Sequence, residues 1–431
     1  MKLPFSLGKK TYTTLAVFVF CIAAIHPSIN AQTLINSPYS RYGLGDIQLK
    51  GFTQQLAMGG ITYGLRSPVY ININSPASYA SIKITTFEVG IRNTTVEQHT
   101  STLKQTKNST SLSYVALAFP VTNWWGGSFG LTPYSSVGYK ISNKETLPNI
   151  GEVNYLFEGS GGTNQVFIGN AFSVFKNLSI GFNASYLFGE LNKERRAIFP
   201  STGYYFNTKE KNTIDIGGFD FQYGLQYKQN LKKEYSLTFG ATMGFASSIK
   251  AKRTILSETY AETNDIEVIK DTSYYSANNK GTINLPQRIG FGIVLKKSEN
   301  FLMGIDYTMQ QWNKFSIFGE SDSLVNSSTL ALGAQYTPDV NPTASFFKKI
   351  QYRAGTHYSK SYLKLKGTQI NETGITVGFA LPLKKTASTI NFSFEIGQRG
   401  TVSNNLIQEK YGMVTLGVTI NDRWFIKSKF D

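Results

Sequence analysis

Apolar and polar residues alternate in segment after segment of this chain from about residue 85 onward, and this period-two pattern constrains the fold more than any other feature. In one such stretch, Ile180, Phe182 and Tyr186 lie on one side of the pattern, whereas Ser179 and Asn183 lie on the other. The same alternation recurs over 236–245, 289–295, 375–381, 390–396 and 414–420. Because successive side chains of a strand point to opposite faces, the pattern predicts a series of antiparallel strands, each with one apolar face.

The apolar faces are predicted to meet lipid, although alternation alone also fits a soluble sandwich. The opposite faces are rich in Gly, Ser, Thr, Asn and Gln, and charged residues make up 16% of the chain against ~25% in soluble domains. Short connections such as 175–178 alternate with long charged ones such as 250–281, as periplasmic turns and external loops do. Aromatic residues at segment ends are typical of interfacial girdles: Trp124, Trp125, Tyr134, Trp312, Trp424 and Phe425. We therefore expect an all-β protein, a single transmembrane antiparallel β-barrel of about 14 strands within residues 85–431.

The first 31 residues are typical of a secretory signal peptide. Lys2, Lys9 and Lys10 precede an apolar run, and the small residue Ala31 closes the segment. Cys21, the one cysteine of the sequence, lies within that run, so the mature chain is expected to lack disulfides and thiol nucleophiles. A secreted barrel of this kind belongs in the cell outer membrane of a Gram-negative bacterium as a multi-pass protein.

The charge and the reactive residues exclude several classes of function. The net charge of +16 becomes +13 without the signal peptide, and for a secreted chain it favours acidic lipid and lipopolysaccharide as neighbours, not nucleic acid. The two histidines that follow the signal peptide, His99 and His357, have no second histidine or carboxylate at metal-ligand spacing. Histidines are too few and serines too many to indicate a Ser-His-Asp triad. We expect a protein that is not an enzyme and holds no cofactor and no metal.

The segment 32–84 differs from the rest because it shows no sustained alternation and is rich in turn formers. A barrel of about 14 strands encloses a lumen that such a segment can plug by pairing its backbone with a polar inner wall. The alternative is a disordered periplasmic tail. Apolar residues such as Leu56, Met58 and Tyr63 favour the plug.

Two short motifs in this segment resemble the long-chain fatty-acid transporter (FadL-like) family of outer-membrane barrels. They are AMGG at 57–60 and NSPAS at 74–78, where Ser75 interrupts the Asn-Pro-Ala motif of the family. The resemblance implies a 14-stranded barrel with an N-terminal hatch, and it assigns the hatch or ligand path to Leu56, Met58, Tyr63, Asn74, Pro76 and Ala77. SPYSRYGLGD at 37–46, GQRGT at 397–401 and NDRWFIKSKF at 421–430 look like a subgroup similar to barrels associated with type 9 protein secretion.

The third expected strand, near 125–141, contains Gly130 and Pro133. Family members release ligand through a gap at a kinked third strand, and proline is unwelcome in a central strand because it donates no ladder hydrogen bond. Pro133 therefore marks either a kink in this strand or its end at Thr132, with a turn following.

Two functions follow from these expectations. The first is passive transport of a hydrophobic small molecule past the hatch and through the lateral gap. It implies an apolar pocket near Leu56, Met58 and Tyr63 with one basic side chain. The alternative is a non-transporting accessory or plug subunit of a type 9 secretion translocon, which would act by protein–protein contacts.

Overall fold

The computed structural model of the protein describes residues 37–48, 51–200, 205–231, 234–263, 266–341, 343–384 and 386–424. The expected signal peptide and Phe425 lie outside these residues. All of the described residues fall within one compact unit of the chain. None of the helices among them is long and apolar enough to cross a membrane.

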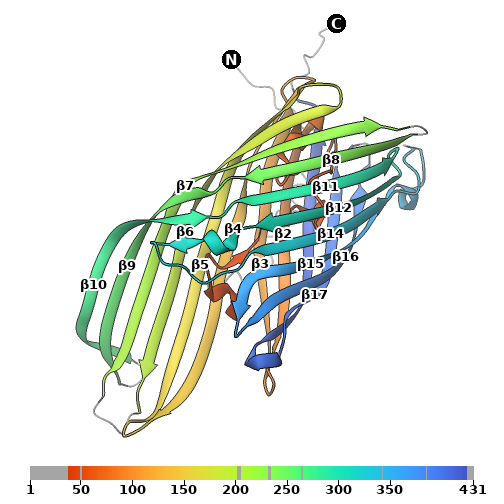
Figure 1. The fold of residues 1–431 in the computed structure, drawn as a ribbon. Helices are drawn as coiled ribbons and strands as arrows, with labels where there is room; N and C mark the ends of the chain where they lie inside the picture. The colour runs from red at the N-terminus through yellow and green to blue at the C-terminus, as the bar shows by residue number, and fades with distance from the viewer. Residues whose placement is uncertain are drawn as a thin grey trace, which may run out of the picture. The chain divides into compact units, whose positions relative to one another are not determined.

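The described chain forms a closed antiparallel barrel of 14 spans, as the sequence predicts (Figure 1). The strands of its wall are β2 (Thr85–His99), β3 (Lys104–Pro120), β4 (Trp125–Leu147), β5 (Gly151–Ser173), β6 (Leu178–Ile198), β7 (Asn207–Asn230), β8 (Tyr235–Gly244), β9 (Ser247–Thr263), β10 (Ile266–Leu285), β11 (Arg288–Lys297), β12 (Phe301–Gln310), β14 (Ser327–Tyr336), β15 (Gln351–Leu365), β16 (Thr368–Pro382), β17 (Thr389–Gly400) and β18 (Gln408–Asp422). The barrel closes where β18 pairs with β2 along its whole length. Because the sheet closes on itself, it has no first and last strand with an unpaired edge, as an open sheet has.

Two spans are each built from two consecutive strands. Strand β7 pairs with β8 over its second half and with β9 over its first half, so β8 and β9 form one interrupted span. Strands β10 and β11 form the next, because they pair with β9 and β8 respectively. The stretch 250–281, expected as an external loop, lies within the β9–β10 hairpin, which extends beyond the shorter strands in Figure 1.

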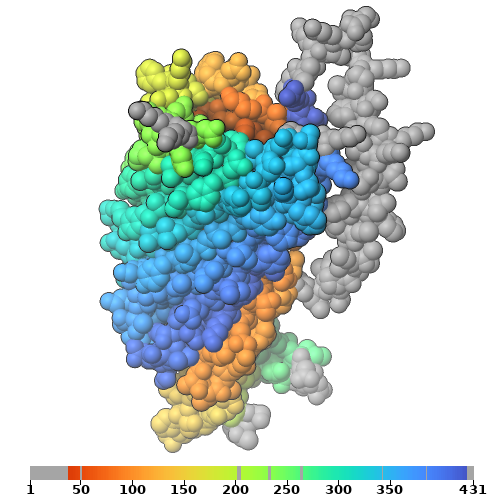
Figure 2. All heavy atoms as spheres, turned by 90° about the vertical axis from the view of Figure 1, so that its right-hand side faces the viewer, coloured from red at the N-terminus to blue at the C-terminus, as the bar shows by residue number. Residues whose placement is uncertain are grey.

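Side chains alternate between the two sides of the wall, and they face the sides that the sequence predicts. On β6, Phe182 and Tyr186 are exposed on the outer face, whereas Ser179 and Asn183 are buried on the inner face. Figure 2 shows one side of the outer face as a continuous surface of side chains over the later strands, in blue. The apolar face of each span therefore points outward, where a membrane barrel meets lipid.

The residues expected to form aromatic girdles divide into two groups. Trp124 and Trp424 are exposed, as girdle residues are. Tyr134 and Trp312 are buried in an apolar cluster inside the barrel, together with Phe315 and Leu324. This part of the interior is therefore apolar, whereas the sequence predicts a polar interior throughout.

Small elements fill the interior and the mouths of the barrel. In the N-terminal segment they are η1 (Pro38–Arg41), β1 (Asp46–Ile47), α2 (Thr53–Leu56) and η2 (Pro76–Ser81). In the connections between wall strands they are η3 (Trp312–Lys314), β13 (Ser316–Ile317), η4 (Phe346–Lys349) and η5 (Ser403–Asn405). Most described residues of the N-terminal segment are buried, and Ile61, Ile71 and Tyr79 are fully so.

Candidate functional site

Glycines on the inner wall form the surface on which the N-terminal segment packs. A methyl group added at any of twelve wall glycines would lie within 3.0 Å of an atom of that segment. They are spread over eleven strands and are Gly126, Gly169, Gly181, Gly224, Gly240, Gly290, Gly292, Gly333, Gly355, Gly378, Gly400 and Gly417. The missing Cβ atoms let the segment approach the wall backbone closely.

Buried polar side chains of the wall satisfy the backbone of this segment. Asp306 accepts hydrogen bonds from the N–H groups of Thr62 and Tyr63, the latter over 2.9 Å. Glu88 accepts a bond from the N–H of Ile71 over 2.6 Å, and the Gln226 amide donates to the carbonyl oxygen of Tyr63 over 2.7 Å. Buried backbone groups need such partners, so these contacts fix the path of the segment inside the barrel.

The expected hatch residues lie in different surroundings. Leu56, Tyr63 and Asn74 line a cavity of about 280 Å³ inside the barrel. Met58 is buried in an apolar cluster with residues of β11, β12 and β14, away from this lining. Pro76 and Ala77 open η2 and pack against Gly181 and Gly224 of the wall, also away from the cavity.

The lining of this cavity is mixed, with many charged groups among apolar side chains. Its lining includes the basic residues Arg92, Arg288 and Arg399. It also includes five carboxylates, which belong to Asp46, Asp306, Glu372, Glu395 and Glu409. The expectation of a single basic side chain beside the pocket is therefore wrong, because inward positions on β2, β11 and β17 each carry an arginine that lines it.

The ladder between β3 and β4 stops part of the way along both strands. It runs from the Pro120–Gly126 pair to the Val115–Leu131 pair. Beyond Leu131, β3 remains paired with β2, and β4 remains paired with β5 as far as Leu147. We call this unpaired stretch between the two strands the β3–β4 seam.

Gly130 and Pro133 lie where the seam begins. Strand β4 does not end at Thr132 but continues past Pro133, and its register with β5 shifts between Pro133 and Ser135. A register shift of this kind is a bulge, which bends the strand. Residues 134–139 are all buried, so both faces of β4 are covered there.

The N-terminal segment covers the edge of β4 in the seam. Asp46 and Ile47 of β1 pair with Ser136 and Ser135. The N–H groups of Gln48 and Ser37 donate to the carbonyl oxygens of Tyr134 and Gly138 over 2.9 and 2.8 Å. A second, small cavity of about 40 Å³ lies in the seam, lined by both strands and by the N-terminal segment.

Arg399, on β17, ties the same segment to β17 and β18. Its guanidinium donates to Asp46 and Ser37 over 2.8 Å each, and to Glu409 over 2.7 and 2.9 Å. Glu409 is 1% exposed. Two nitrogens of the guanidinium, Nε and Nη2, donate to the same oxygen of Glu409. Hydrogen bonds between oppositely charged groups are stronger than those between neutral groups.

We call the hydrogen bonds of Arg399 with Asp46, Ser37 and Glu409 the clamp, and Tyr39 lies beside it. Burial raises the pKa of Tyr39 to about 12, so its hydroxyl stays protonated and donates to the carbonyl oxygen of Ile407. The Arg399 guanidinium lies 5.5 Å from the centre of the Tyr39 ring, within cation–π range.

Sequence reasoning missed the charged residues of the cavity. Arg399 appears in the sequence only as part of the GQRGT motif, with no role attached. Glu395, Arg399 and Glu409 nevertheless occupy inward positions of membrane-spanning strands. An ionisable residue at such a position is expensive, so its presence is a usable indication of a site.

The barrel shares its fold with toluene transporters and with a FadL homologue. It is similar to the Pseudomonas putida toluene transporter TodX, with 14% identity over 86% of this chain and 98% of TodX, at a TM-score of 0.57. It is also similar to the Ralstonia pickettii toluene transporter TbuX, with 14% identity over 86% of this chain and 99% of TbuX, at a TM-score of 0.57. A Pseudomonas aeruginosa FadL homologue matches with 10% identity over 88% of this chain and all of the homologue (100%), at a TM-score of 0.54.

These similarities define the fold as a FadL-like β-barrel. The chain belongs to the BamG family, whose family model matches residues 11–431. No curated protein matches the sequence. The expected membership of a subgroup associated with type 9 secretion is not confirmed by these comparisons.

Proposed function

We propose that the protein is a passive channel of the outer membrane that carries a hydrophobic small molecule from the luminal cavity sideways through the β3–β4 seam. In this proposal the N-terminal segment is the hatch. The observation that carries the proposal is the seam itself, because the wall there is closed by two residues of β1 in place of a β3–β4 ladder. The fold shared with the toluene transporters supports it.

The lining of the cavity indicates the kind of solute. A wholly apolar molecule gains little from a wall that carries Arg92, Arg399 and several carboxylates. A solute with an apolar body and one polar end fits better, since the polar end can replace water at these groups while the body leaves through the seam. The outward apolar faces support the proposal that lipid and lipopolysaccharide surround the barrel.

Nothing in the described residues favours the alternative of a secretion-translocon subunit. The luminal surface is occupied by the N-terminal segment, and the matches named above with the same fold are channels. We therefore propose transport alone.

A reversible covalent lock on the seam tests this proposal. Gln48 and Tyr134 form a hydrogen-bonded pair, so the next pair along the ladder, Ile47 and Ser135, is of the closer, non-hydrogen-bonded kind. Cα atoms in such pairs lie ~4.5 Å apart, within the range of a disulfide. The double variant Ile47→Cys/Ser135→Cys should therefore form a disulfide between β1 and β4 on oxidation.

Uptake is measured in Gram-negative cells that carry the full chain, with dodecanoate bearing a fluorophore at its far end. Uptake should fall to the level of cells without the barrel when the disulfide forms, and return when it is reduced. Each single cysteine variant, treated with the same oxidant, is the control. Unchanged uptake with the disulfide shown to be closed, or no uptake above background by the unmodified protein, would refute the proposal.

A further inference from the structure

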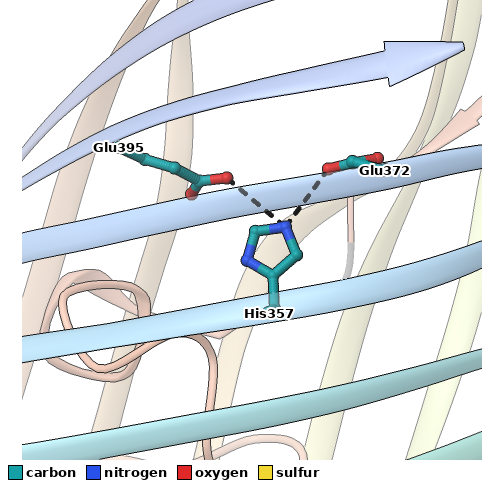
Figure 3. Close-up of side chains that lie close together, drawn as sticks. All are labelled: His357, Glu372 and Glu395. Carbon is teal, nitrogen blue, oxygen red and sulfur yellow. Dashed lines mark ion pairs between the residues drawn. The ribbon is translucent and has the colours of Figure 1, made fainter.

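Three side chains from three adjacent strands converge on the wall of the luminal cavity (Figure 3). They are His357 of β15, Glu372 of β16 and Glu395 of β17. One ligand atom of each lies within 4.8 Å of the others. His357 and Glu395 are buried, with 6% and 5% of their surface exposed.

The register of the strands explains why these residues meet although they are far apart in sequence. His357 lies opposite Gly374, which lies opposite Gly397. A methyl group on Gly374 would lie 2.4 Å from Cε1 of His357 and 3.0 Å from Oε1 of Glu395. Gly374 therefore forms the floor of a hollow that the imidazole and the two carboxylates surround.

The hydrogen bonds of the cluster leave one nitrogen without a partner. Nε2 of His357 is buried and makes no hydrogen bond with any described residue. Figure 3 shows this nitrogen directed at both carboxylates, and it lies 3.5 Å from Oε1 of Glu372 and 3.7 Å from Oε1 of Glu395. Both distances are longer than a hydrogen bond.

The two carboxylates also share one donor. The Tyr411 hydroxyl lies 2.9 Å from Oε1 of Glu372 and 3.1 Å from Oε1 of Glu395. A hydroxyl has one proton, so it can donate to one of these oxygens at a time. A positive ion between the two carboxylate oxygens and the imidazole nitrogen would therefore interact favourably with all three atoms.

From these contacts we propose that His357, Glu372 and Glu395 bind a divalent metal ion of the zinc class through Nε2 and one oxygen of each carboxylate. Tetrahedral bonds of about 2.0–2.1 Å separate neighbouring ligand atoms by ~3.4 Å. The nitrogen–oxygen separations of 3.5 and 3.7 Å are close to that value. One nitrogen and two oxygens form a ligand set that zinc accepts, whereas magnesium and calcium prefer oxygen alone.

The surroundings suit a cation with an open coordination position. Arg399 is engaged by Asp46 and Glu409, so its charge is already matched by those two carboxylates. Arg92 donates to the Gln48 amide oxygen over 3.2 Å. All three proposed ligands face the cavity of about 280 Å³, so water or a bound molecule can complete the coordination.

This inference goes beyond the proposed transport and does not depend on it. A metal ion at this place could fix the polar end of a molecule in the cavity, since carboxylates and similar groups bind to zinc at an open position. The seam lies between β3 and β4, and its lock joins β1 to β4, whereas the cluster is carried by β15, β16 and β17.

The test uses the full barrel, purified in detergent, stripped with a chelator and titrated with Zn²⁺ alone by calorimetry. Cobalt replacement adds a spectrum, because tetrahedral Co²⁺ absorbs visible light strongly. We expect one equivalent of metal to bind. Glu395→Gln and His357→Gln should weaken binding by roughly tenfold or more, since even outer-sphere partners of metal ligands are worth about 10–100-fold.

Two further variants make the test specific. Gly374→Ala keeps all three ligands but fills the floor, so it should also weaken binding. His99→Gln removes the imidazole of the other described histidine–carboxylate pair, with Glu97, and should leave binding unchanged. Heat-modified mobility on gels shows which variants are folded. Absence of binding by the unmodified barrel, or binding that folded His357→Gln and Glu395→Gln variants retain in full, would overturn the inference.

Discussion

The packing of the N-terminal segment against wall glycines can be tested at Gly240. An ideal Cβ at this position would lie 1.8 Å from the carbonyl oxygen of Tyr63, where an ordinary contact begins near 3.4 Å. Gly240→Ala therefore requires the Tyr63 backbone to move by ~1.5 Å or leave. Gly244, on the same strand and the same face, has its nearest neighbouring atom at 3.7 Å, so Gly244→Ala is a matched control.

The contacts of Tyr63 set the magnitude of the effect. Its carbonyl oxygen accepts from Gln226 over 2.7 Å, its N–H donates to Asp306 over 2.9 Å, and its hydroxyl lies 2.7 Å from the Thr308 hydroxyl. Loss of two of these bonds costs about 1–3 kcal/mol, and overpacking adds about 1–3 kcal/mol. Partial relaxation of the surrounding structure reduces this sum. We therefore expect the packing of the N-terminal segment against the wall to be weakened by about 2–4 kcal/mol.

The assay uses a single cysteine as a reporter of seating. Ser78 lies in η2 and is 4% exposed, so a thiol in the Ser78→Cys variant is protected while the segment is seated. The one native cysteine, Cys21, lies in the expected signal peptide. A loss of 2–4 kcal/mol should raise the rate of thiol labelling in outer-membrane vesicles by about 30-fold to roughly 1,000-fold.

Gly244→Ala should label at the rate of the parent Ser78→Cys protein. Equal rates for Gly240→Ala and Gly244→Ala would show that the segment does not depend on close contact with the wall at Tyr63. The reasoning on all twelve wall glycines would then fail, because Gly240 is the position where the contact is closest.

Two further changes test the wall and the clamp. Leu416 lies on the outward face of β18. If this position is near the midplane of the membrane, Leu416→Arg should lower the free energy of unfolding in lipid vesicles by about 2–4 kcal/mol. Unchanged stability would place the residue away from lipid. Arg399→Ala leaves the buried Glu409 and the partly buried Asp46 without their cation, and breaking a buried pair typically costs about 3–5 kcal/mol. A thiol in the Ile47→Cys variant should then label faster, and an unchanged rate would mean that β1 is held by its pairing with β4 alone.

The sequence predicts the strands of this barrel and their facing because both depend on a local property. Alternation with a period of two identifies a strand and its lipid-facing side wherever one face meets lipid and the other does not. The stretch 250–281 was missed for the same reason. It forms most of the β9–β10 hairpin, where polar and charged residues occupy both faces, so no apolar face marks the strands.

The cavity residues depend on register, which the sequence pattern does not specify. His357, Glu372 and Glu395 are brought together because His357 pairs with Gly374 and Gly374 pairs with Gly397. A shift of two residues in either ladder would keep every outward face outward and separate the three side chains. Alternation cannot distinguish these registers, so the cluster could not be predicted from it.

The closed seam bears on how the proposed transport could occur. For a solute to leave between β3 and β4, β1 must leave the edge of β4, and Asp46 must then separate from Arg399. Separating the partly buried Asp46 from Arg399 removes part of the compensation of a largely buried guanidinium, so opening without a replacement anion is unfavourable. A solute whose polar end is an anion offers that compensation, because it can take the place of Asp46 on the guanidinium. In this view the transported molecule itself opens the seam. A neutral analogue with the same apolar body should therefore pass more slowly than the acid.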